Sequence, residues 1–307
     1  MILMEKAAFE CTIVGGGIAG LQAAIQLGRY EHNVLIIDSN EGRSTLCKNY
    51  HNILGWPDGV SGEHLREQGL KHALQYGVQR IQDKVIEISK KEQLFSLKTS
   101  NGSTFLTKTV LFATGIKENI PQWPNLKPCL GKTIYICPDC DGYEIRGKKT
   151  YVLGSGEAGA NMALTLTYWT NNLIYINHTG EKINDITNRE LVKKQIKYLD
   201  CKVSDVMIRE EGQFKGVLLA NQEQLEGDRA FLAFGGNQVL SKLAESLGAQ
   251  TEKHHVVVNP RTKETSIENV WAAGDLITHS EQVTIAMGDG VQAAIWIHKR
   301  LLSKRKN

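Results

Sequence analysis

The sequence predicts an α/β protein with two Rossmann-like domains of the three-layer ββα type, the second inserted into the first. Its 307 residues are about twice the length of a typical single domain. Two apolar runs, 11–14 and 150–153, each lead into a G-x-G-x-x-G turn and a helical stretch, which indicates two nucleotide-binding units. A third apolar run, 270–275, follows the second unit. If this run packs back onto the first unit, the first domain is discontinuous.

The composition is that of an ordinary globular protein and argues against several classes of function. Hydrophobic residues make up 41% and charged residues 22%, with a net charge of +3. The only basic cluster is the tail 299–306, which is not a stripe of cations interleaved with aromatic side chains across a folded face. No apolar run approaches the roughly 18–20 residues of a membrane span. Glu5 and Lys6 stand where a signal peptide needs apolar residues. We therefore expect a cytoplasmic protein without a nucleic-acid or membrane partner.

The first unit is predicted to hold the adenosine half of a dinucleotide. Its glycine turn contains Gly15, Gly17 and Gly20, and bare backbone at a helix N-terminus can receive a pyrophosphate. The apolar run 34–37 ends at Asp38, about 20 residues further on, where a carboxylate accepts hydrogen bonds from a ribose. A simple turn residue is the alternative reading of Asp38.

The second unit is predicted to bind a pyridine dinucleotide, either NADH or NADPH. Its turn contains three glycines: Gly154, Gly156 and Gly159. The next strand, 172–176, is not followed by an acid at the ribose position. The segment 177–182 contains no arginine that would grip a 2′-phosphate, and Lys182 and His178 are weak substitutes. The sequence does not choose between the two nucleotides.

Cys137 and Cys140 are the candidate redox pair. The other four cysteines stand far apart: Cys11, Cys47, Cys129 and Cys201. A zinc site would need a second Cys or His pair, which none of these four supplies, whereas a redox disulfide needs only the two-residue spacer. We therefore predict a redox disulfide and no metal. Asp141 follows directly and is either a proton donor to a thiolate or a helix-capping carboxylate.

The last segment reads as a helix that begins at about Gln282. Val291, Ile295 and Leu302 recur on one face at helical spacing, so we expect them in the core. His298 is expected at the surface.

Together, these motifs resemble those of the low-molecular-weight thioredoxin reductases. The resemblance covers nearly the whole chain and rests on the order of five motifs: 15–20, 113–115, 137–142, 154–159 and 273–275. It implies an FAD-binding domain in two segments, 1–117 and 239–307, and an inserted NAD(P)-binding domain, 118–238, that carries the redox pair. It also implies a homodimer formed through the FAD domains. Glutathione-reductase-type enzymes are excluded because their disulfide follows the first glycine turn, where this chain has only Cys47.

The resemblance implies roles for individual residues. Cys140 would face the flavin, Cys137 would attack the substrate, and Asp141 would act as the acid. The implied FAD-binding residues are Asp275 near the ribityl chain, Gln282 and Val283 near the flavin ring, and Asn52, Val85, Ala113, Gly115 and Gly274.

The chain departs from the family pattern at three places. The segment 177–179 lacks the arginine pair of the family's NADPH users, and Glu281 stands where the family has an arginine. The stretch 43–52, with the Cys-Pro-Asp-Cys motif, looks closer to a branch that includes dithiol oxidases acting on small disulfide natural products. Electron donor and substrate therefore stay open.

The leading functional prediction is an FAD-dependent disulfide reductase. Electrons would pass from NAD(P)H through FAD to the Cys137–Cys140 disulfide, and then to a thioredoxin-like protein or a small disulfide substrate. Three alternatives stay open: a dithiol oxidase with oxygen as acceptor, a reductase fed by ferredoxin, and a non-catalytic flavin redox sensor.

Overall fold

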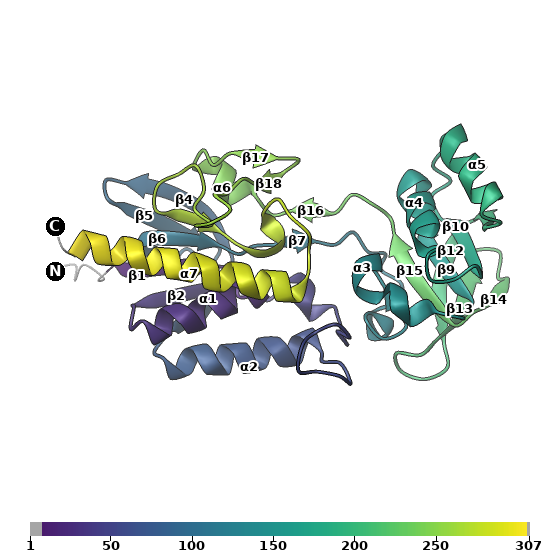
Figure 1. Ribbon diagram of the computed structural model, residues 1–307, viewed down its shortest axis with the longest axis horizontal. Helices are drawn as coiled ribbons and strands as arrows, with labels where there is room; N and C mark the ends of the chain where they lie inside the picture. The colour runs from purple at the N-terminus through teal and green to yellow at the C-terminus, as the bar shows by residue number, and fades with distance from the viewer. Residues whose placement is uncertain (1–7, 306–307) are drawn as a thin grey trace. The chain divides into compact units, whose positions relative to one another are not determined.

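The computed structural model describes residues 8–305, which divide into two compact units (Figure 1). Unit 1 comprises the described residues up to Thr45, Glu63–Lys117 and the segment from Gln238 onward. Unit 2 comprises Leu46–Gly62 and Glu118–Asn237. Two of the four crossings between the units, after Lys117 and after Asn237, lie within one residue of the expected domain boundaries. Leu46–Gly62, in contrast, packs with unit 2 instead of with the first segment.

Unit 1 is built on a seven-stranded sheet with the order β3-β2-β1-β6-β5-β4, and β19 pairs with β6 outside this path. The parallel strands are β1 (Phe9–Val14), β2 (Val34–Asp38), β3 (Gln79–Gln82), β6 (Thr104–Phe112) and β19 (Val270–Ala272). The antiparallel strands are β4 (Val85–Lys91) and β5 (Leu94–Thr99). β2 and β19 are buried throughout, which explains why they read as continuous apolar runs.

The two faces of this sheet carry separate apolar cores. The first core packs the sheet against α1 (Ile18–Arg29), α2 (Gly62–Gln75) and α7 (Val283–Arg305). The second packs it against α6 (Lys242–Ser246) and its neighbouring segments. The smaller elements of the unit are η1 (Arg43–Thr45), β7 (Ile116–Lys117), β16 (Gln238–Val239), β17 (Thr251–Glu252), β18 (His255–Val256) and η4 (Gly274–Leu276).

The predicted core face of the C-terminal helix was wrong. The face of α7 that is buried presents small and apolar residues: Ala286, Gly290, Ala293, Ala294, Ile297 and Leu301. Val291 and Ile295 are only half-buried, and Leu302 is 39% exposed. The physical reason is the close approach of α7 to α1, since a side chain at Gly290 would overlap the carbonyl oxygen of Ala19. Small residues, which carry little hydrophobic signal, therefore form the contact.

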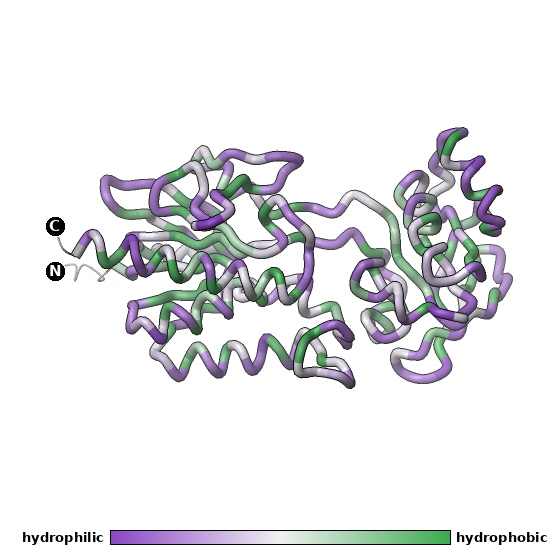
Figure 2. Tube along the Cα trace, in the orientation of Figure 1, coloured by the Kyte–Doolittle hydropathy of each residue, from purple (hydrophilic) through white to green (hydrophobic). Residues whose placement is uncertain are grey.

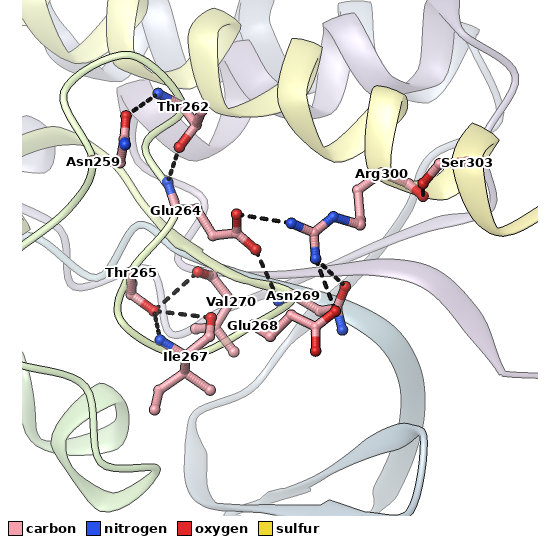
Figure 3. A network of polar contacts seen from close by, with 10 residues as sticks. All are labelled: Asn259, Thr262, Glu264, Thr265, Ile267, Glu268, Asn269, Val270, Arg300 and Ser303. Atoms are coloured by element: carbon pink, nitrogen blue, oxygen red, sulfur yellow. Dashed lines mark hydrogen bonds and ion pairs between the residues drawn. The ribbon is translucent and has the colours of Figure 1, made fainter.

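A polar network joins α7 to the loop that leads into β19 (Figure 3). Arg300 donates to Glu264 and to Glu268, each over 3.0 Å, and to Asn269 over 3.3 Å. Glu264 in turn accepts from the Asn269 N–H. The network fixes the strand that carries the third apolar run to the end of the long helix.

Unit 2 contains a five-stranded parallel sheet with the order β11-β10-β9-β15-β8. Its strands are β8 (Ile134–Tyr135), β9 (Thr150–Gly154), β10 (Leu173–Asn177), β11 (Lys197–Asp200) and β15 (Arg229–Ala233). A second, antiparallel sheet consists of β12 (Val203–Ile208), β13 (Phe214–Leu219) and β14 (Gln224–Glu226). The helical elements are η2 (Lys127–Cys129), α3 (Pro138–Asp141), η3 (Gly142–Ile145), α4 (Gly156–Leu166) and α5 (Asp185–Lys193).

Each unit thus has its own sheet with parallel central strands, and a glycine turn joins β1 to α1 in unit 1 and β9 to α4 in unit 2. Hydrophobic residues concentrate along the central strands, and hydrophilic residues lie on the outer loops (Figure 2). The predicted α/β fold with two Rossmann-like units is confirmed. Within residues 8–305, none of the helices combines the length and apolar character needed to span a bilayer.

Candidate active site

The redox pair lies in unit 2 at the start of a short helix. Cys137 is the N-cap of α3, and Pro138 occupies a first-turn position, where no backbone N–H is needed. Cys137 and Cys140 form a disulfide with their Cα atoms 5.3 Å apart. The Cys140 N–H donates to Cys137 Sγ over 3.2 Å. Once the disulfide is reduced, this N–H would stabilise a thiolate on Cys137, as a nucleophile requires.

Asp141, which follows Cys140 in the sequence, is buried. Its N–H donates to the Cys137 carbonyl over 3.0 Å, which fixes its backbone to the redox turn. Asp141 precedes η3, but its side chain makes no capping hydrogen bond there.

His51, which the sequence reasoning missed, stands beside Asp141. Its Nδ1 lies 3.9 Å from Asp141 Oδ1, an ion-pair separation, while Asn49 Nδ2 donates to its Nε2 over 2.9 Å. The Asp141 carboxylate raises the pKa of His51, and the charge of Glu144 acts the same way, whereas burial opposes both. No periodicity marks His51 in the sequence. Only the packing of Leu46–Gly62 in unit 2 brings it to the redox turn.

The first glycine turn fits a dinucleotide. Gly15 has φ +106°, and a side chain there would overlap the Ala113 carbonyl, while a side chain at Gly20 would overlap the Gly15 carbonyl. In contrast, no atom lies within 4 Å of the place where a Cβ of Gly17 would stand. The N-cap of α1 makes no side-chain capping bond, so the first N–H groups of this helix are directed at that open space.

Asp38 lies at the end of β2 beside this turn. Its Oδ1 accepts from the Gly16 N–H over 3.0 Å, and its Oδ2 accepts from Arg66 Nη2 over 2.8 Å. Each carboxylate oxygen has a second acceptor position, which a ribose hydroxyl can use. Buried Arg66 Nη1 has no hydrogen-bond partner among residues 8–305, as expected of a donor meant for a ligand. Arg66 was absent from the predicted site because it comes from α2, 28 residues away.

Gly274 and Asp275 follow β19, the strand formed by the third apolar run, and belong to unit 1. Gly274 has φ +76°, and its N–H donates to Asp289 Oδ2 of α7 over 3.2 Å. Arg43 bridges Asp275 and Glu281, with Nη1 at 3.1 Å and 2.6 Å from the two carboxylates. Glu281, where the family has an arginine, is thus paired with a cation from η1 instead.

The other predicted FAD residues are distributed as follows. Gly115 has φ +65° and its carbonyl accepts from Leu240, and Gln282 and Val283 stand at the start of α7. Val85 is buried in the second apolar core of unit 1. Asn52 is exposed and lies in the segment that packs with unit 2.

The second glycine turn is built like the first. A side chain at Gly154 would overlap the Ala233 carbonyl, and the ring of Tyr175 fills the place of a side chain at Gly159. The N-cap of α4, Ser155, makes no side-chain capping bond. The N-terminus of α4 can therefore receive a pyrophosphate, but the turn differs from that of unit 1 at its second glycine, because the Glu181 side chain lies against Gly156 whereas no atom lies near the equivalent Gly17. Within the described chain, no three His, Cys, Asp or Glu side chains cluster as a metal site would require.

Comparison with known proteins agrees with this site. The pyridine nucleotide-disulphide oxidoreductase family matches residues 9–290. A thioredoxin reductase of Treponema pallidum is 28% identical over 301 residues, covering 93% of this chain and 95% of the relative. A thioredoxin reductase of Coxiella burnetii is 27% identical over 300 residues, covering 92% and 93%. The solved thioredoxin reductase of Streptococcus pyogenes shares the fold, with a TM-score of 0.85 at 21% identity, covering 97% of this chain and 100% of that structure.

The resemblance inferred from the sequence motifs is therefore confirmed. Two dinucleotide turns and a redox disulfide occur in one chain, and the family match covers both units. The chain belongs to the pyridine nucleotide-disulphide oxidoreductase family and is an oxidoreductase that uses FAD and a pyridine nucleotide.

Proposed function

We propose that this protein is a disulfide reductase of the thioredoxin-reductase type, acting on a thioredoxin-like protein or a small disulfide. The single observation that carries the proposal is the Cys137–Cys140 disulfide on a short helix, with a buried carboxylate next to it in sequence. The relatives from Treponema pallidum and Coxiella burnetii support it, since both carry the name thioredoxin reductase.

When bound, FAD accepts two electrons from a pyridine nucleotide and delivers them to the disulfide. The two electrons break the sulfur–sulfur bond and leave two thiolates, one of which takes up a proton. Cys137, whose sulfur accepts the Cys140 N–H, attacks the substrate disulfide and releases one substrate thiolate. Cys140 then attacks the mixed disulfide at Cys137, which releases the second thiolate and restores the starting bond.

Asp141 and His51 supply the protons for this exchange. The departing substrate thiolate must be protonated, and a carboxyl–imidazole pair beside the redox turn can pass a proton to it. Asp141, buried next to Cys140, is the donor to the sulfur, and His51 connects Asp141 to solvent because it is only half-buried.

The working form in this proposal is a cytoplasmic homodimer. Both features rest on the likeness to the thioredoxin reductases.

An anaerobic titration tests the proposal. The purified yellow protein is mixed with NADH and, separately, with NADPH, and the visible flavin band is followed. Bleaching by at least one nucleotide, reversed by an added disulfide substrate, is expected. If neither nucleotide bleaches the flavin and small dithiols do, the protein is a dithiol oxidase instead. If reduced ferredoxin bleaches the flavin and neither nucleotide does, the proposed pyridine-nucleotide donor is wrong.

A further inference from the structure

The two units differ at the strand end that faces a bound ribose. Asn177 is in register with Gly154, so it occupies in unit 2 the position that Asp38 occupies in unit 1. Its Oδ1 accepts from the Gly156 N–H over 3.0 Å, and its Nδ2 donates to the Glu181 carbonyl and to the Tyr198 hydroxyl. With both amide hydrogens in use, Asn177 is a structural residue of the turn.

The carboxylate that lies next to this glycine turn is that of Glu181, four residues after Asn177. Asn177 holds the Glu181 carbonyl, and the Glu181 side chain lies over the glycine turn. A Cβ built on Gly156 would stand 3.0 Å from Glu181 Cβ and 3.2 Å from its Oε2. Because Gly156 is where the backbone approaches the pyrophosphate of a dinucleotide, this exposed carboxylate borders the dinucleotide site.

The surrounding charges are mainly negative. Glu157, in the first turn of α4, accepts from the Asn184 N–H and from Thr187 Oγ1. The Asp200 carboxylate lies 3.4 Å from where a Cβ of Gly180 would stand. Together with Glu181, two further carboxylates therefore surround the end of β10.

This segment offers few positively charged side chains that could balance the charge of a phosphate. Burial lowers the pKa of His178, and Lys202 lowers it further, while its Nδ1 accepts from the Val203 N–H over 3.0 Å. His178 is therefore neutral at physiological pH and offers at most one uncharged donor. The segment 177–187 contains no arginine, and Lys182 is its only lysine. A dianionic 2′-phosphate would find no fixed, bidentate partner.

We propose that unit 2 selects NADH over NADPH and that Glu181 is the specificity-determining residue. The inference rests on the proposed function, which requires a pyridine nucleotide, and adds which one is used. A carboxylate at the glycine turn accepts hydrogen bonds from the 2′- and 3′-hydroxyls of an unmodified ribose. The same carboxylate repels a 2′-phosphate, which carries nearly two negative charges at pH 7.

Calorimetric titration of the oxidised holoenzyme with NAD⁺ and NADP⁺ measures this preference without flavin reduction. Wild type should bind NAD⁺ at least about tenfold more tightly than NADP⁺, because like charges in contact are strongly unfavourable. Glu181→Gln should narrow the ratio, and Glu181→Arg should reverse it. The matched control Glu211→Gln, which removes an exposed carboxylate in the β12–β13 turn, should leave the ratio unchanged.

The outcomes separate this inference from the proposed function. Equal or tighter binding of NADP⁺ by wild type overturns the inference and leaves the reductase proposal intact. An unchanged ratio in both Glu181 variants, with circular dichroism confirming that they fold, overturns the role of Glu181. If neither nucleotide binds the holoenzyme and neither reduced form bleaches the flavin, both proposals fail.

Discussion

The two sulfurs of the redox turn have different surroundings, and they should react differently. Only Cys137 Sγ accepts the Cys140 backbone N–H, so a lone thiolate is better stabilised at position 137. Cys140→Ser should therefore trap a disulfide substrate as a stable mixed disulfide on Cys137, detectable by intact-mass spectrometry. Cys137→Ser should still allow flavin reduction by nucleotide but should lose steady turnover. Trapping on Cys140 instead would reverse the two roles.

His51 and Asp141 form a pair that can be titrated. Because Asp141 raises the pKa of His51, Asp141→Asn should lower that pKa, as followed by the NMR shift of the imidazole ring. Glu144→Gln, the matched control, should lower it less, because Glu144 has the smaller effect. Asp141→Asn should also slow disulfide exchange by about 10²-fold, the usual loss of a general acid. A pKa of His51 indifferent to Asp141→Asn would contradict the pairing.

At the scale of the element, two substitutions in the first glycine turn should affect different properties, one the stability of the fold and the other the binding of FAD. A Cβ at Gly20 overlaps the Gly15 carbonyl, so Gly20→Ala should cost about 1–3 kcal/mol of unfolding free energy even without FAD. A Cβ at Gly17 meets no protein atom, so Gly17→Ala should change the apoprotein by less than about 1 kcal/mol. It should nevertheless weaken FAD binding, because the methyl group occupies the space intended for the pyrophosphate. Denaturant unfolding of the apoproteins and flavin content distinguish the two effects.

The start of α7 carries a pH-dependent link to the Gly274 turn. His279 Nε2 lies 2.5 Å from Asp289 Oδ2, and Lys263 Nζ lies 2.8 Å from the other oxygen. Asp289 raises the pKa of His279 above 6.5, against the effect of burial. Burial alone would raise the pKa of Asp289, but His279 and Lys263 outweigh it and hold that pKa below 3.8.

The two pKa shifts determine how the stability of the fold changes with pH. A raised histidine pKa stabilises the fold below pH 6.5, and this contribution is lost as the pH rises through the raised value. A lowered carboxyl pKa stabilises it above pH 3.8, and this contribution is lost as the pH falls through the lowered value. The melting temperature of His279→Gln should therefore fall below wild type most clearly between pH 3.8 and 6.5. The exposed control His254→Asn should show no such window.

At the scale of the whole molecule, the flavin and the disulfide should act as one electron store. Each accepts two electrons, so complete anaerobic reduction of the holoenzyme should consume two equivalents of a two-electron donor per FAD. Cys137→Ser should consume one. A wild-type protein that takes up a single equivalent would show that the disulfide is not reduced through the flavin.

Several parts of this molecule could be predicted from local sequence because local covalent geometry controls them. The glycine turns, the Cys-x-x-Cys spacing and the acid at the end of β2 are short-range patterns, and each forms within one strand–turn–helix unit. The face of α7 was mispredicted because Ala and Gly form its closest contact, at Gly290, and hydrophobic periodicity does not detect small residues.

By itself, therefore, the sequence determined the α/β class, the two dinucleotide turns and the redox pair. Tertiary structure alone decided which distant side chains complete each site: Arg66 at Asp38, Arg43 at Asp275 and His51 at Asp141. These partners lie 28, 232 and 90 positions apart in the chain. The physical reason is that spacing along a chain constrains only neighbours within a few turns, whereas the contact of a charge with its distant partner is created by packing.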